Sequence, residues 1–349
     1  RKREAARAAH KGASFHMSRR VRRRQRKQPH TLQVFLIIVL VLLTVCVLVK
    51  AFFLKAPEQK AAELPAQSAA SDTDSQQSPE EQAAQEALRS HLERKGRFYT
   101  ILVSGSDDGN GNSDTNILVA IDTVNGYIYG TSIARDTKAV WNGKNHKINA
   151  AFGSGGMEKM AEVVSDQLGI PVDYTVSVDL KGFAALVDAI GGVDFDVPVN
   201  MDYEDPYQDL YIHISKGMHH LSGSEALKVV RFRKGYATQD IGRMETQQKF
   251  LKAVAKQTLT VSNLGKIDEF VKIFQKYVKT DLTLGDLAWL GKEAISIGAD
   301  NIEFSTLPGV WNDHDNFIYL NKDDVLTLVN EHLNPYVEDR TADDLNIPD

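Results

Sequence analysis

Residues 115–137, TNILVAIDTVNGYIYGTSIARDT, decide the fold because they hold two apolar runs joined by a tight turn. The runs cover 115–123 and 127–134, and the Asn-Gly pair at 125–126 is a strong β-hairpin signal. A third apolar run, RFYTILVSG at 97–105, ends in glycine, as expected of a buried strand that opens into a loop. The sequence therefore predicts a sheet with at least one antiparallel pair of strands.

Outside this hairpin, strand patterns and helix patterns alternate along the chain. Strand patterns cover 173–179, 193–199 and 302–309, and helix patterns cover 155–168, 181–191, 223–230, 241–259, 263–277, 283–297 and 323–333. Such alternation is typical of an α/β layered domain, and the early hairpin favours a mixed sheet over a parallel one. We therefore expect an α/β fold with a central mixed β-sheet flanked by helices over residues 91–338, followed by a C-terminal tail at 339–349.

The first ninety residues divide into three segments of different composition. Residues 1–33 are basic, with twelve Lys or Arg and one acid among the first thirty. Residues 34–54, VFLIIVLVLLTVCVLVKAFFL, are long and apolar enough to cross a bilayer as a helix, and positively charged flanks stay in the cytoplasm. Residues 55–90 are rich in Ala, Gln, Ser, Glu and Pro and cannot bury a core.

These segments predict a single-pass protein of the cell membrane. The predicted order is a cytoplasmic tail, an N-terminal transmembrane helix, an extracytoplasmic tether and a folded body outside the cell. The alternatives for the apolar segment are a cleaved signal peptide, which is usually shorter, and a buried core helix. The basic tail is alternatively a DNA-binding arm, but a folded body outside the membrane argues against a nucleic-acid partner.

Several kinds of chemistry are excluded by the residues that the chain lacks. Cys46 is the only cysteine and lies in the apolar segment, so neither a disulfide within the chain nor cysteine catalysis is available. The sequence has no phosphate-binding GxxxxGK[ST] loop, no Gly-x-Ser-x-Gly nucleophile turn and no HExxH metal motif. His146 beside Lys147 is a candidate phosphate contact, whereas His219 and His220 are expected on a surface loop.

Candidate site residues gather in short stretches at predicted strand ends or loops. These stretches are GSDDGNGNSDT at 105–115, SIARDT at 132–137, VVRFRKG at 229–235 and QDIGRMETQQ at 239–248. In the first, Asp107 and Asp114 flank a Gly/Asn loop, and two carboxylates suit a hard divalent cation such as Mg²⁺. An EF-hand is excluded because Ser113 and Val119 stand where the turn glycine and the bidentate glutamate belong. Alternatively, these acids are ordinary turn residues.

The arginines of the other three stretches suggest a site for phosphate groups. Arg135 follows a predicted strand, and Arg231 and Arg233 alternate, so that in an extended chain both would point to one face. Arg243 lies near the start of a predicted helix. Guanidinium groups bind phosphate bidentately, and several that converge indicate a pyrophosphate. The alternative is a set of surface salt bridges.

The order of these motifs resembles that of the LytR-CpsA-Psr family. The matching motifs over roughly residues 97–260 are GxD…SDT…ILV…D, SIxRDT, KINAAFxxGG, VDxxGFxxLVDAIGGVDFDV, G…LxGxxALxxVRFR and DxGRxxxQQxFL. The resemblance implies a deep apolar pocket for the polyprenyl chain of a polyprenyl-pyrophosphate-linked glycopolymer, of teichoic acid or capsule type. It also implies a reaction in which a peptidoglycan hydroxyl attacks the sugar-linked phosphorus, so that the glycopolymer becomes attached by a phosphodiester bond and polyprenyl phosphate leaves.

The resemblance also assigns roles to residues of this chain. It implies that Mg²⁺ is bound by Asp107 and Asp114. It implies that the pyrophosphate is bound by Arg135, Arg231, Arg233 and Arg243, and that further site positions are Asp136, Lys147, Asp240 and Gln247. Asp136 is expected to orient its neighbour Arg135.

The sequence departs from the family pattern at three positions. Asn112 and Thr246 stand where many relatives have arginine, and Ala134 replaces a common proline. The first two changes remove positive charge from the expected rim of the site, where Asn112 remains a candidate substrate contact. The alternatives to the transferase are therefore a polyprenyl-pyrophosphate hydrolase, which uses water as the acceptor, and a non-catalytic lipid-binding regulator of the cell envelope.

Overall fold

The computed structural model describes the folded body and a short segment before it. The described residues are 55–59, 92–106, 111–208, 210–236, 240–258 and 267–348. In these ranges no helix is long and apolar enough to span a membrane. The predicted cytoplasmic tail, the predicted span at 34–54 and most of the predicted tether lie outside the described residues.

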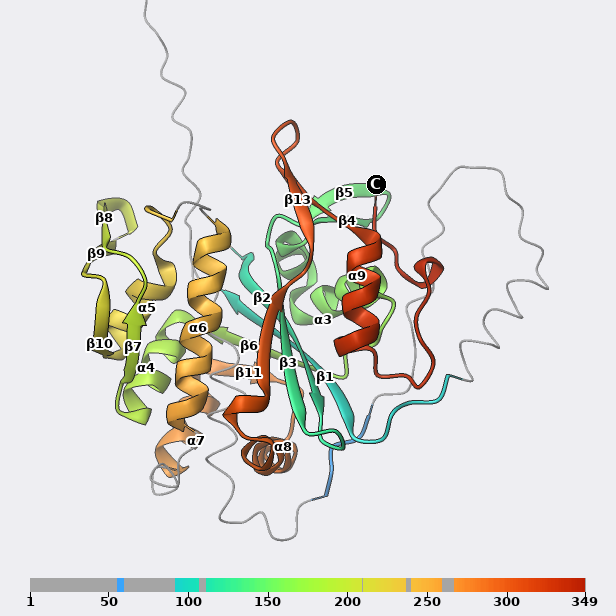
Figure 1. Ribbon diagram of the computed structural model, residues 1–349, viewed down its shortest axis with the longest axis horizontal. Helices are drawn as coiled ribbons and strands as arrows, with labels where there is room; N and C mark the ends of the chain where they lie inside the picture. Colours follow the sequence, from blue (N-terminus) through green and yellow to red (C-terminus); the bar gives the residue numbers. More distant parts are fainter. Residues whose placement is uncertain are drawn as a thin grey trace, which may run out of the picture.

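A mixed sheet forms the centre of the molecule, as predicted (Figure 1). Its strand order is β11-β6-β1-β2-β3-β12. The strand bounds are β1 (Phe98–Ser106), β2 (Ser113–Asp122), β3 (Tyr127–Ile133), β6 (Tyr174–Asp179), β11 (Val278–Thr280) and β12 (Ile302–Thr306). β1 pairs with β2 and β2 with β3 in antiparallel fashion, whereas β6 runs parallel to β1 and β12 parallel to β3. The predicted hairpin is therefore the β2–β3 pair.

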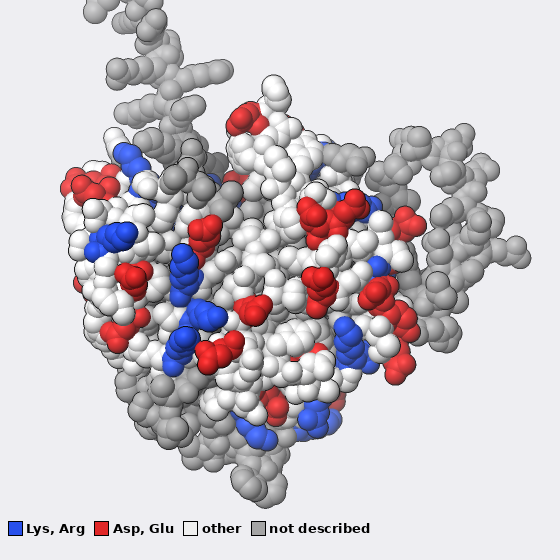
Figure 2. Space-filling model, in the orientation of Figure 1, with Lys and Arg blue, Asp and Glu red and all other residues white. Residues whose placement is uncertain are grey.

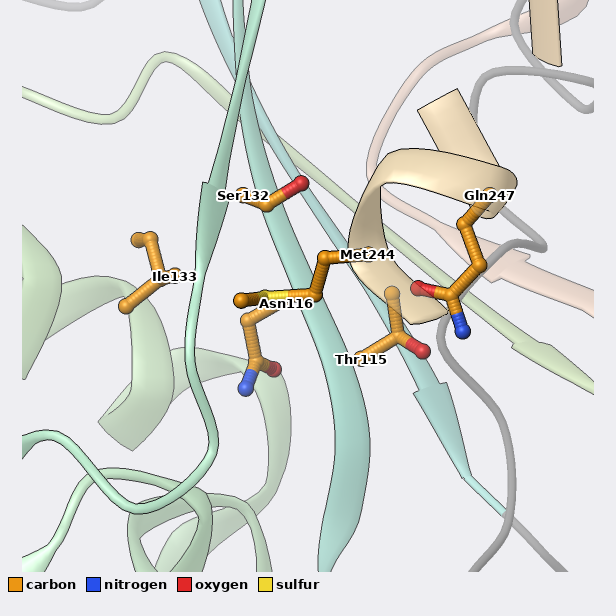
Figure 3. Close-up of a pocket in the computed structure, with 6 residues that line it drawn as sticks. All are labelled: Thr115, Asn116, Ser132, Ile133, Met244 and Gln247. Atoms are coloured by element: carbon orange, nitrogen blue, oxygen red, sulfur yellow. The ribbon is translucent and has the colours of Figure 1, made fainter. Parts of the chain in front are cut away.

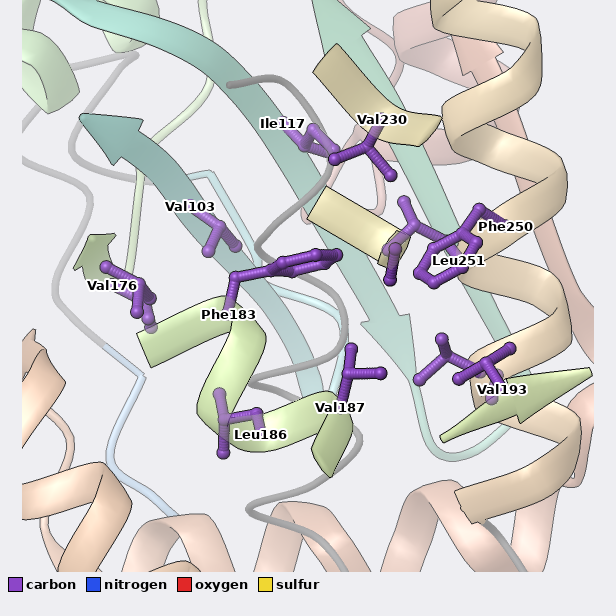
Figure 4. Packing of buried hydrophobic residues seen from close by; sticks show 14 of the residues in the cluster. Val103, Ile117, Val176, Phe183, Leu186, Val187, Val193, Val230, Phe250 and Leu251 are labelled. Atoms are coloured by element: carbon purple, nitrogen blue, oxygen red, sulfur yellow. The ribbon is translucent and has the colours of Figure 1, made fainter. Parts of the chain in front are cut away.

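Helices cover both faces of this sheet (Figure 1). One face packs against α4 (Leu180–Ile190), α5 (Gly223–Arg231), α6 (Asp240–Thr258), α7 (Ile267–Tyr277) and α8 (Leu284–Ile297). The other face packs against α3 (Asn149–Leu168) and α9 (Lys322–Leu328). Figure 4 shows the first core cluster, in which side chains of α4, α5 and α6 converge on those of β1 and β2.

The alternation of side chains along β2 explains the two cores. Ile117, Val119 and Ile121 belong to the cluster under α4 to α8, whereas Leu118 and Ala120 belong to the cluster under α3 and α9. Successive residues of a strand point to opposite faces, so an uninterrupted apolar run fits a strand with helices on both sides. The apolar run that identifies β2 in the sequence therefore also supplies the side chains that pack against the helices on both faces.

Several two-stranded hairpins surround the sheet, and most of them were not predicted. They are β4 (Lys138–Trp141) with β5 (Lys144–Lys147), β7 (Val193–Val197) with β10 (Gly217–Leu221), β8 (Met201–Asp205) with β9 (Leu210–Ile214), and β13 (Gly309–Asn312) with β14 (Phe317–Leu320). Of these strands only β7 was predicted. His219 and His220 therefore lie on an exposed strand rather than on a loop.

Candidate functional site

The candidate site lies at the end of the sheet where β1 ends, β2 begins and β3 ends, which we call the site end. Asn116 of β2 pairs with Ile133 of β3 there, and α6 lies alongside. A small cavity opens between these elements. Figure 3 shows the residues that line it, which are Thr115, Asn116, Ser132, Ile133, Met244 and Gln247.

Three of the four predicted stretches meet around this cavity. Thr115 and Met244 line it, and they directly follow Asp114 and Arg243 in the chain. Gln247 lines it too and donates a hydrogen bond of 2.9 Å from its amide nitrogen to the carbonyl of Val230. That bond connects the cavity to the end of α5, where the 229–235 stretch begins. The convergence predicted from the sequence is therefore present in the fold.

A chain of ion pairs runs from β2 through the loop after β3 to β5. Arg135 Nη1 lies 3.0 Å from Asp114 Oδ1, and Arg135 Nε lies 3.4 Å from Asp136 Oδ2. Lys147 Nζ lies 2.7 Å from the other oxygen of Asp136. The side chains of Asp114 and Arg135 are 9% and 15% exposed, whereas that of Lys147 is 35% exposed. Asp136 therefore lies where it can orient the side chain of Arg135, as predicted.

Backbone hydrogen bonds fix the loop that carries this chain. The start of α3 binds to the loop, because the amide of Asn149 donates to the carbonyl of Arg135 at 3.2 Å. The amide of Ile148 donates to the carbonyl of Thr137 at 2.8 Å. On the other side, a side chain at Gly153 of α3 would lie only 2.6 Å from the amide oxygen of Asn112. The close approach that Gly153 permits places Asn112 against α3, beside the start of β2.

The arginines of the other two stretches lie on α5 and α6. Arg231 is the last residue of α5, so it is helical and not in an extended chain as expected. The next residue, Phe232, is extended and 1% exposed, which leaves Arg231 and Arg233 partly exposed on either side of it. Burial raises the pKa of Tyr203, and the charges of both arginines oppose that rise. The two guanidinium groups therefore act on the same region, next to β8.

Arg243 is the most deeply buried cation of the site. It is 1% exposed and is among the largest fully buried side chains in the described part of the chain. A buried guanidinium is costly unless anionic or polar groups compensate its charge. It lies on α6 directly before the cavity residue Met244.

Thr246 does not occupy the rim position that was expected of it. It is 2% exposed, and its hydroxyl donates to the carbonyl of Gly242 at 2.9 Å within α6. Burial raises the pKa of Tyr236, and a hydrogen bond with Thr246 works in the opposite direction. The residue that replaces the arginine of many relatives is therefore an interior contact between α6 and the loop before it.

The side chains of two predicted acids lie outside the described part of the chain. Asp240 is the first residue of α6, where a carboxylate is favoured by the helix dipole, but its side chain lies outside what the structure describes. Asp107 also lies outside the described residues. Among the side chains described, no group of three or more His, Cys, Asp or Glu is placed to hold a metal ion. Asp114 nonetheless fits Mg²⁺, which proteins often bind through one or two carboxylates together with substrate phosphates.

The deep apolar pocket and the phosphate contact of His146 stay predictions. The cavity between β2, β3 and α6 is small, and four of its six lining residues are polar, namely Thr115, Asn116, Ser132 and Gln247. The ring of His146 stacks on that of Trp141, with centroids 4.0 Å apart.

Gln248 is a positioning residue that sequence reasoning missed. Its amide nitrogen lies 3.0 Å from the carbonyl oxygen of Ser305 and 3.1 Å from the hydroxyl of Thr306. These bonds fasten α6 to β12 at the sheet edge, while the adjacent Gln247 fastens it to α5. The pair of glutamines was itself the available signal, since two adjacent amides on a helix reach two different neighbours.

The site therefore presents an anion-binding surface with acids placed among the cations. Its described side chains include five cations, Arg135, Lys147, Arg231, Arg233 and Arg243, and two carboxylates, Asp114 and Asp136. Such a surface can bind two adjacent phosphate groups and stabilise negative charge that develops on them. It belongs to an α/β domain with a central mixed sheet.

Comparison with known proteins identifies the family of this domain. The model of the LytR_cpsA_psr family matches residues 62–333, and the chain belongs to that family. The chain is 34% identical over 203 residues to the polyisoprenyl-teichoic acid–peptidoglycan teichoic acid transferase TagV of Bacillus subtilis, a match that covers 55% of this chain and 52% of that protein. It is 39% identical over 194 residues to a TagU transferase of Bacillus cereus, covering 54% and 62%. The chain thus spans between half and two thirds of the length of these relatives.

Solved structures support the same assignment. The crystal structure of Bacillus subtilis TagV matches with a TM-score of 0.59 at 30% identity, covering 70% of this chain and 100% of that one. The structure of protein gbs0355 from Streptococcus agalactiae also matches with a TM-score of 0.59, at 25% identity, covering 67% and 86%. The mixed sheet with helices on both faces is therefore the fold of this family.

Proposed function

We propose that the chain is a membrane-anchored, Mg²⁺-dependent phosphotransferase that attaches a polyprenyl-pyrophosphate-linked glycopolymer to peptidoglycan outside the cell. The observation that carries this proposal is the shared ion-pair chain of Asp114, Arg135, Asp136 and Lys147 beside the buried Arg243. The names of the relatives, which are teichoic acid transferases, support the substrate class.

The cations of the site bind and orient the pyrophosphate in this proposal. Arg135 follows β3, Arg243 lies on α6, Arg231 ends α5 and Arg233 follows α5 by two residues. A guanidinium that is already held by a carboxylate needs little reorganisation when negative charge moves to the leaving phosphate. In phosphoryl transfer the protein contributes mainly through such positioning and charge stabilisation.

Asp114 is the described residue that would hold the magnesium ion. The ion would neutralise the charge of the phosphate oxygens when it is bound. Asp114 is also held by Arg135, which fixes its orientation in the absence of substrate. The predicted second ligand, Asp107, would come from the loop between β1 and β2. The hydroxyl of peptidoglycan is the acceptor, and polyprenyl phosphate is the leaving group.

The test is a transfer assay with the full chain, a labelled polyprenyl-pyrophosphate-linked glycopolymer and soluble peptidoglycan oligomers. Arg135→Ala and Arg231→Ala should each reduce transfer about 10²–10³-fold. Arg97→Ala is the matched control, because Arg97 is exposed and lies at the opposite end of β1. A chelator should abolish transfer, and added Mg²⁺ should restore it.

The same assay separates the competing activities. Release of polyprenyl phosphate at a rate independent of peptidoglycan would identify a hydrolase. Donor binding without turnover, with or without an acceptor, would identify a non-catalytic lipid-binding protein. Full transfer activity in both arginine variants would exclude the proposed site.

A further inference from the structure

The β13–β14 hairpin stands beside the candidate site and exposes apolar surface. Val310 pairs with Tyr319 and Trp311 with Ile318 across the hairpin. Val310 is 71% exposed and Trp311 is 44% exposed. Figure 1 shows the hairpin projecting beyond the sheet next to β4 and β5, and Figure 2 shows it standing clear of the surrounding surface with an acidic side chain beside its tip.

This hairpin is bonded directly to the ion-pair chain of the site. The amide of Ile318 donates to the carbonyl of Asp136 at 2.9 Å, and Ile318 also forms a β-bridge with Thr137. Lys147 Nζ, which binds Asp136 at 2.7 Å, lies 5.7 Å from the centre of the Trp311 ring. The indole is therefore one contact away from the group of charges proposed to act on the phosphates.

The exposed ring of Trp311 is held in place by its own hairpin. Its indole nitrogen donates to Asp313 at 2.8 Å, and the hydroxyl of Tyr319 donates to Asp315 at 2.5 Å. Lys138 Nζ lies 4.4 Å from the centre of the Tyr319 ring, which fastens the base of the hairpin to β4. Such contacts orient the ring before any ligand arrives, which lowers the entropy cost of binding.

Trp311 also differs from the other tryptophans of the chain. The sequence contains three, and Trp141 and Trp289 are each 6% exposed. An indole buries a large apolar area when covered, and its ring face carries negative potential that attracts polarised C–H groups. A preoriented indole left open beside a polar site therefore fits a ligand that offers both C–H faces and hydroxyl groups.

We propose that the β13–β14 hairpin binds the acceptor glycan, with a pyranose ring stacked on Trp311. The tip of the hairpin, Asn312 to Asn316, supplies amide and carboxylate groups that can bind sugar hydroxyls. Lys147 joins this surface to the phosphate site. The inference rests on the proposed transferase function, because it assigns a place to the acceptor of that reaction.

A membrane surface is the competing partner for an exposed tryptophan, and the charges of the hairpin argue against it. Asp313 and Asp315 lie at the tip and would meet anionic headgroups. The basic neighbours Lys138 and Lys147 lie over the rings of Tyr319 and Trp311, which leaves the two acids as the charged groups at the tip. A glycan strand carries hydroxyl groups that can donate hydrogen bonds to such carboxylates.

Tryptophan fluorescence tests the binding step without any need for catalysis. Soluble peptidoglycan glycan strands should shift the emission of the full chain to shorter wavelength and protect it from acrylamide, because Trp311 is the exposed indole. Trp311→Ala should raise the Kd for the strands about tenfold, equivalent to about 1.4 kcal/mol, and Trp311→Phe should restore most of the affinity. An unchanged Kd in Trp311→Ala, or a shift with anionic phospholipid vesicles but none with glycan strands, would overturn the proposal.

The transfer assay then connects the surface to the reaction. Trp311→Ala should raise the KM for peptidoglycan oligomers about tenfold with a smaller change in kcat. The control is Val124→Ala, since Val124 is 68% exposed and lies in the turn after β2, at the opposite end of the sheet. Glycan binding that depends on Trp311 in a chain without transferase activity would refute the proposed function and leave the glycan surface intact. Transfer by Trp311→Ala with an unchanged KM for peptidoglycan oligomers would support the proposed function and refute the glycan surface.

Discussion

An Arg–Asp ion pair lies at each end of the central sheet, and the two pairs are connected differently. At the end opposite the site, Arg94 binds Asp173 through two parallel hydrogen bonds, each 2.8 Å long. Asp173 is completely buried and also accepts hydrogen bonds from the amide and the hydroxyl of Thr100, at 2.9 and 3.1 Å. This pair joins the residues before β1 and β6 in one geometry.

At the site end, the equivalent pair is shared among more groups. Arg135 gives Asp114 one hydrogen bond and turns its Nε toward Asp136, which also binds Lys147. A bidentate pair with additional donors holds structure, whereas a shared chain distributes its charges over four side chains. An incoming phosphate can therefore compete for the cations at the site end without leaving a carboxylate alone. The same two residue types thus serve stability in one place and binding in the other.

The largest expected effect comes from breaking the shared chain at Asp114. Asp114→Asn should reduce transfer about 10²–10³-fold, because it weakens the proposed magnesium ligand and releases the orientation of Arg135. The free energy of unfolding should fall by only about 1 kcal/mol, since Arg135 keeps Asp136 as a partner. Transfer rates and urea unfolding measure the two effects separately. A large loss of stability together with normal transfer would reverse the assignment of the two pairs.

The matching substitution at the opposite end of the sheet should reduce stability strongly and transfer little. Asp173→Asn removes the charge that compensates Arg94 and should cost about 3 kcal/mol of unfolding free energy. For a domain of this size that corresponds to a fall of about 10 °C in Tm. Transfer per folded molecule should stay near the wild-type value, because Asp173 lies at the far end of the sheet from Asp114. Calorimetry, with transfer measured well below the Tm, checks both parts.

The central sheet and its helices were predictable because buried strands and helices require apolar residues at recognisable spacings in the sequence. The β2 run is apolar on both faces since both faces are covered, and the Asn-Gly pair after it marks the hairpin turn, where Gly126 has a φ of 74°. The arginines and Asp114 were found through their spacing and family resemblance. Asp114 and Arg135 come together because the start of β2 and the end of β3 meet at one edge of the sheet, whereas Arg231 and Arg243 lie on helices.

The hairpins around the site were not predictable by the same reasoning. Their strands are four or five residues long and partly exposed, so apolar alternation is weak. One signal was available and missed: Asn142-Gly143 has positive φ at both residues, 52° and 66°, and forms the tight turn between β4 and β5. The interior position of Thr246 could not be read from the sequence, since burial there depends on how α6 packs under Tyr236.

A smaller effect is expected at the outer end of the shared chain. Lys147→Gln removes a cation whose side chain is 35% exposed, and exposed ion pairs contribute roughly 0–1 kcal/mol to stability. Transfer should fall about tenfold, because Asp136 then binds Arg135 more strongly and holds it back from the phosphate. Lys144→Gln is the matched control, since Lys144 is an exposed lysine on the same strand. Equal effects of the two variants would show that the chain ends at Asp136.

The smallest expected effect concerns the segment before the folded body, at the end of the sheet that carries Arg94. The side-chain amide of Gln59 donates to the carbonyls of Lys95 and Phe98 at 2.9 and 2.8 Å. The hydroxyl of Tyr174 donates to the carbonyl of Glu58 at 2.5 Å. These bonds place Glu58 and Gln59 against the domain at the same end of the sheet as Lys95 and Phe98.

Replacement of residues 60–91 by eight Gly or Ser residues should leave the fold intact and stabilise it slightly. Reducing the number of residues between positions 59 and 92 about fourfold lowers the entropy cost of bringing these two positions together by about 1 kcal/mol, which should raise the Tm by about 3 °C. Tyr174→Phe is the companion variant, because it removes the bond to Glu58 while leaving the 60–91 segment in place. If the replacement instead lowered the Tm by as much as Asp173→Asn, the segment would be part of the packed structure at this end of the sheet. The contacts that stabilise the fold at the end of the sheet opposite the site would then include more than the Arg94–Asp173 pair. The two ends of the sheet would differ more strongly in their contribution to stability.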